Sequence, residues 1–128
     1  MKKFSLLLIA LAMISLLVTP GCKSEDPFTI VGTWTGTLTW SDSEVNSCTW
    51  TFTGTESSGS VSINNNYYGS IISGTYTVTG TSVTLNTTWQ VTDGAAHTAN
   101  GMINEATNTI SGNFTQDNGW TGTWTCSR

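Results

Sequence analysis

Val31-Gly32-Thr33-Trp34-Thr35-Gly36-Thr37-Leu38-Thr39-Trp40 is the stretch that decides the fold. From Trp34 to Trp40 every second residue is apolar or glycine, and threonines occupy the positions between them. A period of two residues is that of a β-strand with one buried face. Gly119-Trp120-Thr121-Gly122-Thr123-Trp124-Thr125-Cys126, near the end of the chain, repeats this alternation. We therefore expect a first and a last strand of the same design, in a sheet whose ends meet.

The chain between these two stretches is also rich in strand-forming residues, with Gly, Asn, Asp and Ser at the expected turns. We find no helical period longer than one turn. Asn100-Gly101 interrupts one of the expected strands, where we consider a β-bulge. Eight strands are expected, around residues 31–40, 47–54, 61–63, 71–79, 83–91, 97–104, 110–114 and 120–126.

The distribution of charge and glycine favours a closed sheet over an open one. Residues 57–92 carry no charged side chain, whereas open sheets usually protect their edge strands with charges or proline. Four glycines, at positions 36, 74, 112 and 122, fall in the apolar phase, where they let strands coil tightly. Short turns between all neighbours make up-and-down order the economical topology. We predict an all-β, eight-stranded antiparallel up-and-down β-barrel over residues 29–128, with a two-sheet β-sandwich as the alternative.

The first residues have the features of an export signal rather than of the domain. Lys2 and Lys3 precede an apolar run over residues 4–18, and Gly21-Cys22 follows. This arrangement resembles a bacterial lipoprotein signal, which implies cleavage after residue 21, lipidation of Cys22 and a tether over residues 22–28. The alternative is an ordinary secretory signal. Lys23 after the cysteine weakly favours the outer membrane, so we expect an exported protein anchored in the bacterial cell envelope.

Removal of the signal leaves two basic residues, Lys23 and Arg128, against eight carboxylates. No basic patch can be built from two cations, so nucleic acid is excluded as a partner. Export also bears on the cysteines: if Cys22 is lipidated, Cys48 and Cys126 remain as a pair in an oxidising compartment. We lean toward a disulfide between them, although an up-and-down barrel would put Cys48 at the opposite rim. The alternative is two buried reduced thiols.

Two features, one near each end of the expected domain, resemble those of a known family. Gly32-Thr33-Trp34 is similar to the Gly-x-Trp motif of lipocalins, and Arg128 stands where that family keeps an arginine that covers the tryptophan. The resemblance implies a lipocalin-like barrel whose floor is made by Gly32, Trp34 and Arg128. The segment Gly-Thr-Trp-Thr-Gly-Thr, residues 32–37, is also similar to a segment of avidins, although more weakly.

No group of residues has the pattern of a catalytic or metal site. His97 is the single histidine, and the carboxylates fall in turns or in the tether. We therefore expect no enzyme activity, no cofactor and no metal.

All six tryptophans lie in the apolar phase, so they either fill the barrel or line a pocket. We expect a lipid-anchored binding protein for a small apolar or planar ligand. The alternative is a structural or protein-interaction module with a filled barrel, in which the Tyr67-Tyr68 loop or the threonine surface meets another protein. The expected ligand-binding residues are Trp40, Trp50, Tyr76, Trp89 and Trp120.

Overall fold

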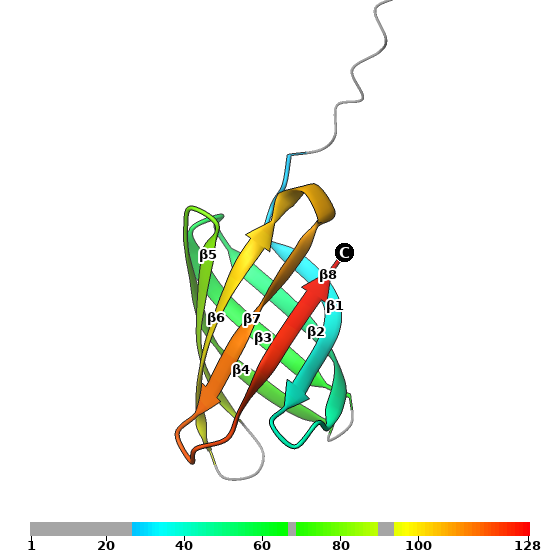
Figure 1. Ribbon diagram of the computed structural model, residues 1–128. Helices are drawn as coiled ribbons and strands as arrows, with labels where there is room; N and C mark the ends of the chain where they lie inside the picture. Colours follow the sequence, from blue (N-terminus) through cyan, green and yellow to red (C-terminus); the bar gives the residue numbers. More distant parts are fainter. Residues whose placement is uncertain (1–26, 67–68, 90–93) are drawn as a thin grey trace, which may run out of the picture.

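The computed structural model describes residues 27–66, 69–89 and 94–128, which form one closed antiparallel β-barrel (Figure 1). Each strand pairs with its neighbours in sequence, and the last strand pairs with the first. The prediction of an eight-stranded up-and-down barrel is confirmed, and the sandwich is excluded. A 3-10 turn, η1 (Glu105–Thr107), joins the sixth and seventh strands. The strands are β1 Gly32–Trp40, β2 Val45–Gly54, β3 Ser58–Asn65, β4 Ser70–Thr79, β5 Ser82–Trp89, β6 Ala96–Asn104, β7 Thr109–Gln116 and β8 Thr121–Ser127.

The alternation of the sequence becomes the inner and outer wall of the barrel. In β1, Trp34 and Leu38 are buried while Thr33 and Thr35 are exposed. The same pattern runs through β2, β3, β5 and β6, whose buried apolar residues join a single cluster. The outer wall is therefore a surface of threonine, serine and asparagine, which can face water without charge.

Three inward-phase glycines lie where the backbone of a neighbouring strand comes very close. A Cβ atom added at Gly36, Gly74 or Gly112 would lie between 1.8 and 2.0 Å from a backbone oxygen of the adjacent strand. The neighbouring backbone thus occupies the space that a side chain would need. Glycine in the inward phase lets these strands fold over one another and close the sheet at this small radius.

One end of the barrel is sealed around Trp34, which is fully buried. Its indole Nε1 donates a hydrogen bond to the carbonyl oxygen of Ile30 at 2.8 Å. The Arg128 guanidinium lies over the ring, 4.7 Å from its centroid, and donates to the carbonyl oxygen of Val31 at 3.0 Å. Gly32 has a φ of +128°, and a Cβ atom there would meet Arg128 at 3.1 Å. We call this the closed end; the described chain begins and ends there (Figure 1).

Two local expectations are corrected by the strand register. The bulge considered at Asn100-Gly101 is wrong, because β6 stays in register with β5 and β7 through both residues. Gly101 is explained by packing instead: a Cβ atom there would lie 2.6 Å from the Trp124 ring. The second strand also begins two residues earlier than expected, at Val45.

None of the described residues belongs to a helix long and apolar enough to span a bilayer.

Candidate functional site

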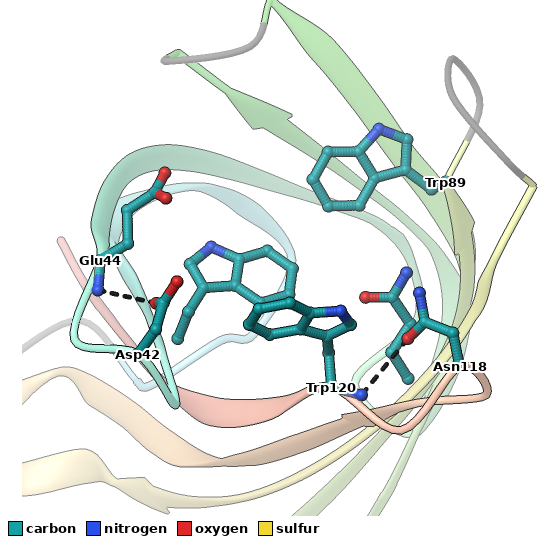
Figure 2. Close-up of a pocket in the computed structure, with 7 residues that line it drawn as sticks. Asp42, Glu44, Trp89, Asn118 and Trp120 are labelled. Carbon is teal, nitrogen blue, oxygen red and sulfur yellow. Dashed lines mark hydrogen bonds between the residues drawn. The ribbon is translucent and has the colours of Figure 1, made fainter.

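The end opposite Arg128 carries a pocket of about 230 Å³, which we call the mouth (Figure 2). The residues that line it come from the β1–β2 turn, the end of β5 and the β7–β8 hairpin. In up-and-down order these connections all fall at the same end of the barrel. The lining residues are Trp40, Asp42, Glu44, Trp89, Gln116, Asn118 and Trp120.

Three indole rings make the apolar part of the mouth. Trp40 stands at the centre, with its ring centroid 5.9 Å from that of Trp89 and 6.4 Å from that of Trp120. The Trp40 and Trp89 rings are tilted by 38°, whereas Trp40 and Trp120 meet at 88°. Trp40 also packs edge-on against Phe114, at 5.0 Å. The rings therefore present differently oriented faces and edges around one hollow.

Hydrogen bonds hold the Trp40 ring in place. Its Nε1 donates to Asn46 Oδ1 at 2.8 Å, and Asn65 Nδ2 donates to the same oxygen at 3.1 Å. Asn46 Nδ2 in turn donates to Glu44 Oε1 at 2.9 Å. Both asparagines are buried. Because each partner is itself fixed, the central ring and the Glu44 carboxylate are positioned before any ligand arrives.

Two carboxylates give the mouth its charge. Glu44 and Asp42 lie on one side of the opening, across from Trp89 and Asn118 (Figure 2). Asp42 Oδ1 accepts a hydrogen bond from the Glu44 backbone N–H at 3.1 Å, which shapes the turn. The one Lys or Arg side chain in the described ranges, Arg128, lies at the closed end. The mouth therefore combines electron-rich rings with negative charge.

The interior below the mouth is filled. An enclosed void of about 20 Å³ lies between Leu38, Trp50, His97 and Trp124 among others, the size of a single water molecule. Trp50 and Trp124 stack with centroids 6.2 Å apart. Neither of their indole N–H groups has a hydrogen-bond partner within the part of the chain that the structure describes. This interior has no room for a ligand larger than water.

The five expected ligand-binding residues do not form one group. Trp40, Trp89 and Trp120 come together at the mouth. Trp50 lines the interior void instead. Tyr76 lies toward the closed end, where its hydroxyl donates to the carbonyl oxygen of Thr55. Burial, and then the charge of Glu56, raise the pKa of Tyr76, so the phenol stays protonated.

Trp120 does not face the interior as its position in the alternation predicts. It precedes β8, which begins at Thr121, and 46% of its surface is exposed. The alternation of β8 does not extend into the turn, where Gly119 has a φ of +94°. The ring is free to lie across the mouth.

The predicted disulfide is wrong: Cys48 and Cys126 are free buried thiols. Cys48 in β2 and Cys126 in β8 both pair with Gly36 of β1, the strand that lies between them. They therefore lie at the same level with one strand between them, rather than at opposite rims. Cα atoms two strands apart in a sheet are separated by more than the roughly 7 Å that a disulfide spans. Burial raises the pKa of Cys48 to about 11 and that of Cys126 to about 12.

The remaining expected positions fall into two classes. Gly32, Trp34 and Arg128 meet at the closed end, in the arrangement that the lipocalin resemblance implied. Cys22 and the Tyr67-Tyr68 pair lie outside the described residues.

Several mouth residues do not stand out in the sequence. In the sequence, Asp42 and Glu44 have the pattern of solvated turn residues. Asn46 and Asn65 have no feature in the sequence that marks them as site residues. A usable signal nevertheless exists for both groups. Alternate turns of an up-and-down barrel share one end, so the turn after Trp40 and the hairpin before Trp120 must be neighbours. Asn46 and Asn65 continue the inward phase of their strands, where a polar residue requires a partner.

The described ranges contain no group of three or more His, Cys, Asp or Glu side chains that could hold a metal ion. His97 is 6% exposed and packs against the rings of Trp89, at 5.5 Å, and Phe114, at 6.1 Å. The residues that line the mouth can therefore interact with a ligand through aromatic contacts, hydrogen bonds and negative charge.

Comparison with known proteins identifies the fold. No protein-family model matches the chain, and neither does any curated protein. Among solved structures, a redesigned β-barrel, b11L5F_LGL, has a TM-score of 0.69 at 18% identity, over 77% of this chain and 90% of that one. The redesigned barrel mFAP1, bound to DFHBI, has a TM-score of 0.68 at 21% identity, over 77% and 94%. A fluorescence-activating β-barrel designed de novo has a TM-score of 0.62 at 16% identity, over 77% and 92%. These likenesses are to small antiparallel barrels and show the fold alone.

Proposed function

We propose that this protein binds a small apolar or planar ligand in the mouth of its barrel, between Trp40, Trp89 and Trp120. The observation that carries the proposal is the pocket itself. Three indoles from separate parts of the chain converge on about 230 Å³ of space, while the interior beneath holds a void of only about 20 Å³. Binding sites in small barrels occur at their mouths. The barrels mFAP1 and EF1p2_mFAP2b, which share this fold, are each bound to the dye DFHBI.

The size of the mouth restricts the ligand. Pockets for drug-sized molecules measure about 300–1,000 Å³, and this one is smaller. A single ring system or a head group fits such a space, and a long acyl chain does not. With the interior filled, we propose that the ligand is held at the rim and not within the barrel.

We propose binding without catalysis. Asp42 and Glu44 are on the same turn, and Glu44 is engaged in positioning Asn46. His97 is buried among rings beneath the mouth. Among the described residues of the mouth, this arrangement lacks a nucleophile next to a base, the pairing that hydrolytic chemistry requires.

We also propose that the protein is exported and anchored in the cell envelope by lipid on Cys22, as a lipocalin-like lipoprotein. Gly21-Cys22 after the apolar run supports this proposal, and so does the closed end that the lipocalin resemblance implied. Metabolic labelling with palmitate tests it: the wild-type chain should incorporate label, and Cys22→Ala should not. An unlabelled wild-type chain would show that the anchor is wrong.

The binding proposal is tested with coumarin, a neutral planar molecule small enough for the mouth. Coumarin should quench the tryptophan emission of the purified protein saturably. Trp120→Ala should weaken this binding by about tenfold, because it removes one wall of the pocket. Met102→Ala is the matched control, since Met102 is 55% exposed and lies outside the mouth. Equal affinities for the two variants would overturn the proposal.

A second function is favoured by the filled interior together with apolar residues near the mouth. Val45 and Ile71, near the mouth-end termini of β2 and β4, are 57% and 48% exposed. With Trp120 they could contact another envelope protein, as a structural or interaction module would. Under this function coumarin does not bind, and Trp120→Ala abolishes a cross-link between this chain and a partner protein.

A further inference from the structure

The rings at the mouth differ from an ordinary apolar patch in their geometry and in their neighbours. The planes of Trp40 and Trp120 are nearly perpendicular, and the plane of Trp89 is tilted by 38° against that of Trp40. An aromatic ring carries negative charge on its face and positive charge at its edge. The ring faces among these three differently oriented indoles therefore favour a positive charge in the hollow between them.

Acidic groups lie beside these rings. Asp42 and Glu44 both line the pocket, and the described chain offers no Lys or Arg side chain at this end. The potential at the mouth is therefore negative, which repels anions and attracts cations. Carboxylates stabilise a cation by attraction, and rings do so by cation–π contact, so both act in the same direction.

Glu44 is positioned for this role by the network beneath it. Asn46 donates to the Glu44 carboxylate and accepts from the Trp40 indole, so one buried amide links an acidic group to the central ring. Asn65 fixes the amide from β3. A site for a purely apolar ligand gains nothing from a carboxylate that a buried amide links to its central ring.

We propose that the ligand of the mouth is a small organic cation, with an alkylated ammonium head group that contacts Trp40, Trp89 and Trp120 and is balanced by Asp42 and Glu44. This inference rests on the proposed binding function and specifies the chemical class of its ligand. A bare metal ion is a poorer occupant, because most of the lining is indole surface. An alkylated ammonium is weakly hydrated and can leave water to lie against indole faces.

The experiment compares choline with 3,3-dimethylbutan-1-ol, which has nearly the same shape but no charge. Calorimetric titration of the full chain should give an affinity for choline at least about tenfold higher than for the alcohol. Raising the salt concentration from about 50 mM to about 500 mM should weaken the binding of choline only.

Two variants separate charge from shape. Glu44→Gln keeps the acceptor for Asn46 but removes the charge, and should weaken choline about threefold to tenfold while leaving the alcohol unchanged. Glu105→Gln is the matched control, because Glu105 lies in η1 at the closed end and should change neither affinity. Trp120→Leu keeps an apolar wall without a π face, and should weaken choline more than the alcohol. Circular dichroism of each variant checks that the barrel is intact.

The possible failures have different meanings. If the alcohol binds as tightly as choline, or if Glu44→Gln and Glu105→Gln bind choline equally, the cation inference is wrong while an apolar site at the mouth remains. If coumarin binds and choline does not, the conclusion is the same. If none of the three probes binds, both the inference and the binding function are overturned.

Discussion

Gly36 lies in the seam between β1 and β8 that closes the barrel, and adding one methyl group there tests the closure. The Cβ atom of an alanine at position 36 would lie 1.9 Å from the Thr125 carbonyl oxygen and 2.6 Å from the Cys126 Cα atom. Ordinary contacts begin at 3.4 Å, so β8 would have to retreat by about 1.5 Å. Hydrogen bonds near 2.9 Å do not survive such a displacement. The seam between the first and last strands would be broken at the pairing of Gly36 with Cys126.

The cost of Gly36→Ala follows from the atoms in its way. Overpacking of a core costs about 1–3 kcal/mol, and the upper part of that range applies where backbone must move instead of a flexible side chain. About 3 kcal/mol corresponds to a fall in Tm of roughly 12–24 °C for a domain near 100 residues. Thermal unfolding followed by far-UV circular dichroism and tryptophan emission measures this fall.

Gly80→Ala is the control for the loss of glycine itself. Gly80 has a φ of +59° and nothing within 4 Å of an added Cβ atom. The substitution there costs about 1 kcal/mol, the penalty of a left-handed conformation, or roughly 4–8 °C in Tm. If Gly36→Ala lowers the Tm no more than Gly80→Ala does, the close approach of β8 to Gly36 does not stabilise the closure, and the reasoning is wrong.

The closed end and the two thiols give further predictions. Arg128→Ala should lower the Tm by roughly 4–8 °C, since it removes a partly exposed cation–π contact and a hydrogen bond that are worth about 1 kcal/mol together. Arg128→Lys should restore little of the lost Tm. Full restoration of the Tm by lysine would show that the positive charge alone matters. Iodoacetamide at pH 8 should label Cys48 and Cys126 only after unfolding, and labelling of the native protein would contradict their burial. The free energy of unfolding should fall as the pH rises from about 9 toward 11, because unfolded thiols lose protons near 9.0 while the folded pKa values are about 11 and 12. Chemical denaturation at pH 8 and at pH 10.5 measures this fall, which should be smaller in Cys48→Ala/Cys126→Ala.

Strand number, order and the inward phase could be predicted because each depends on local pattern. The alternation of Trp34 and Leu38 with threonine survives in the structure because one face of a strand must be buried. Glycines in the inward phase predicted tight coiling, and Gly36, Gly74 and Gly112 are where strands fold over one another.

The errors came from quantities that a local pattern does not contain. The relative level of Cys48 and Cys126 depends on the stagger between strands, which only the pairing register sets. The alternation does not say where the turn ends and β8 begins, so the pattern alone places Trp120 in the interior. The mouth was only partly predicted for a related reason: its rings are visible in the sequence, but Asp42 and Glu44 acquire a role only when the turn that carries them is placed beside the β7–β8 hairpin.

The placement of the two ends bears on where a ligand comes from. The described chain begins at the closed end (Figure 1), and the residues that line the mouth are at the other end. If Cys22 carries lipid, the five residue steps from it to Pro27 span at most about 17 Å. Strands of about nine residues, tilted by about 40°, make a barrel roughly 23 Å long. A tether shorter than the barrel keeps the closed end near the membrane that holds the lipid, and the mouth of an upright barrel then faces away from that membrane. In the proposed anchored protein the ligand therefore arrives from the aqueous side, where a small charged molecule is soluble and a bilayer lipid is not, so the proposed anchor favours the organic cation over an acyl chain.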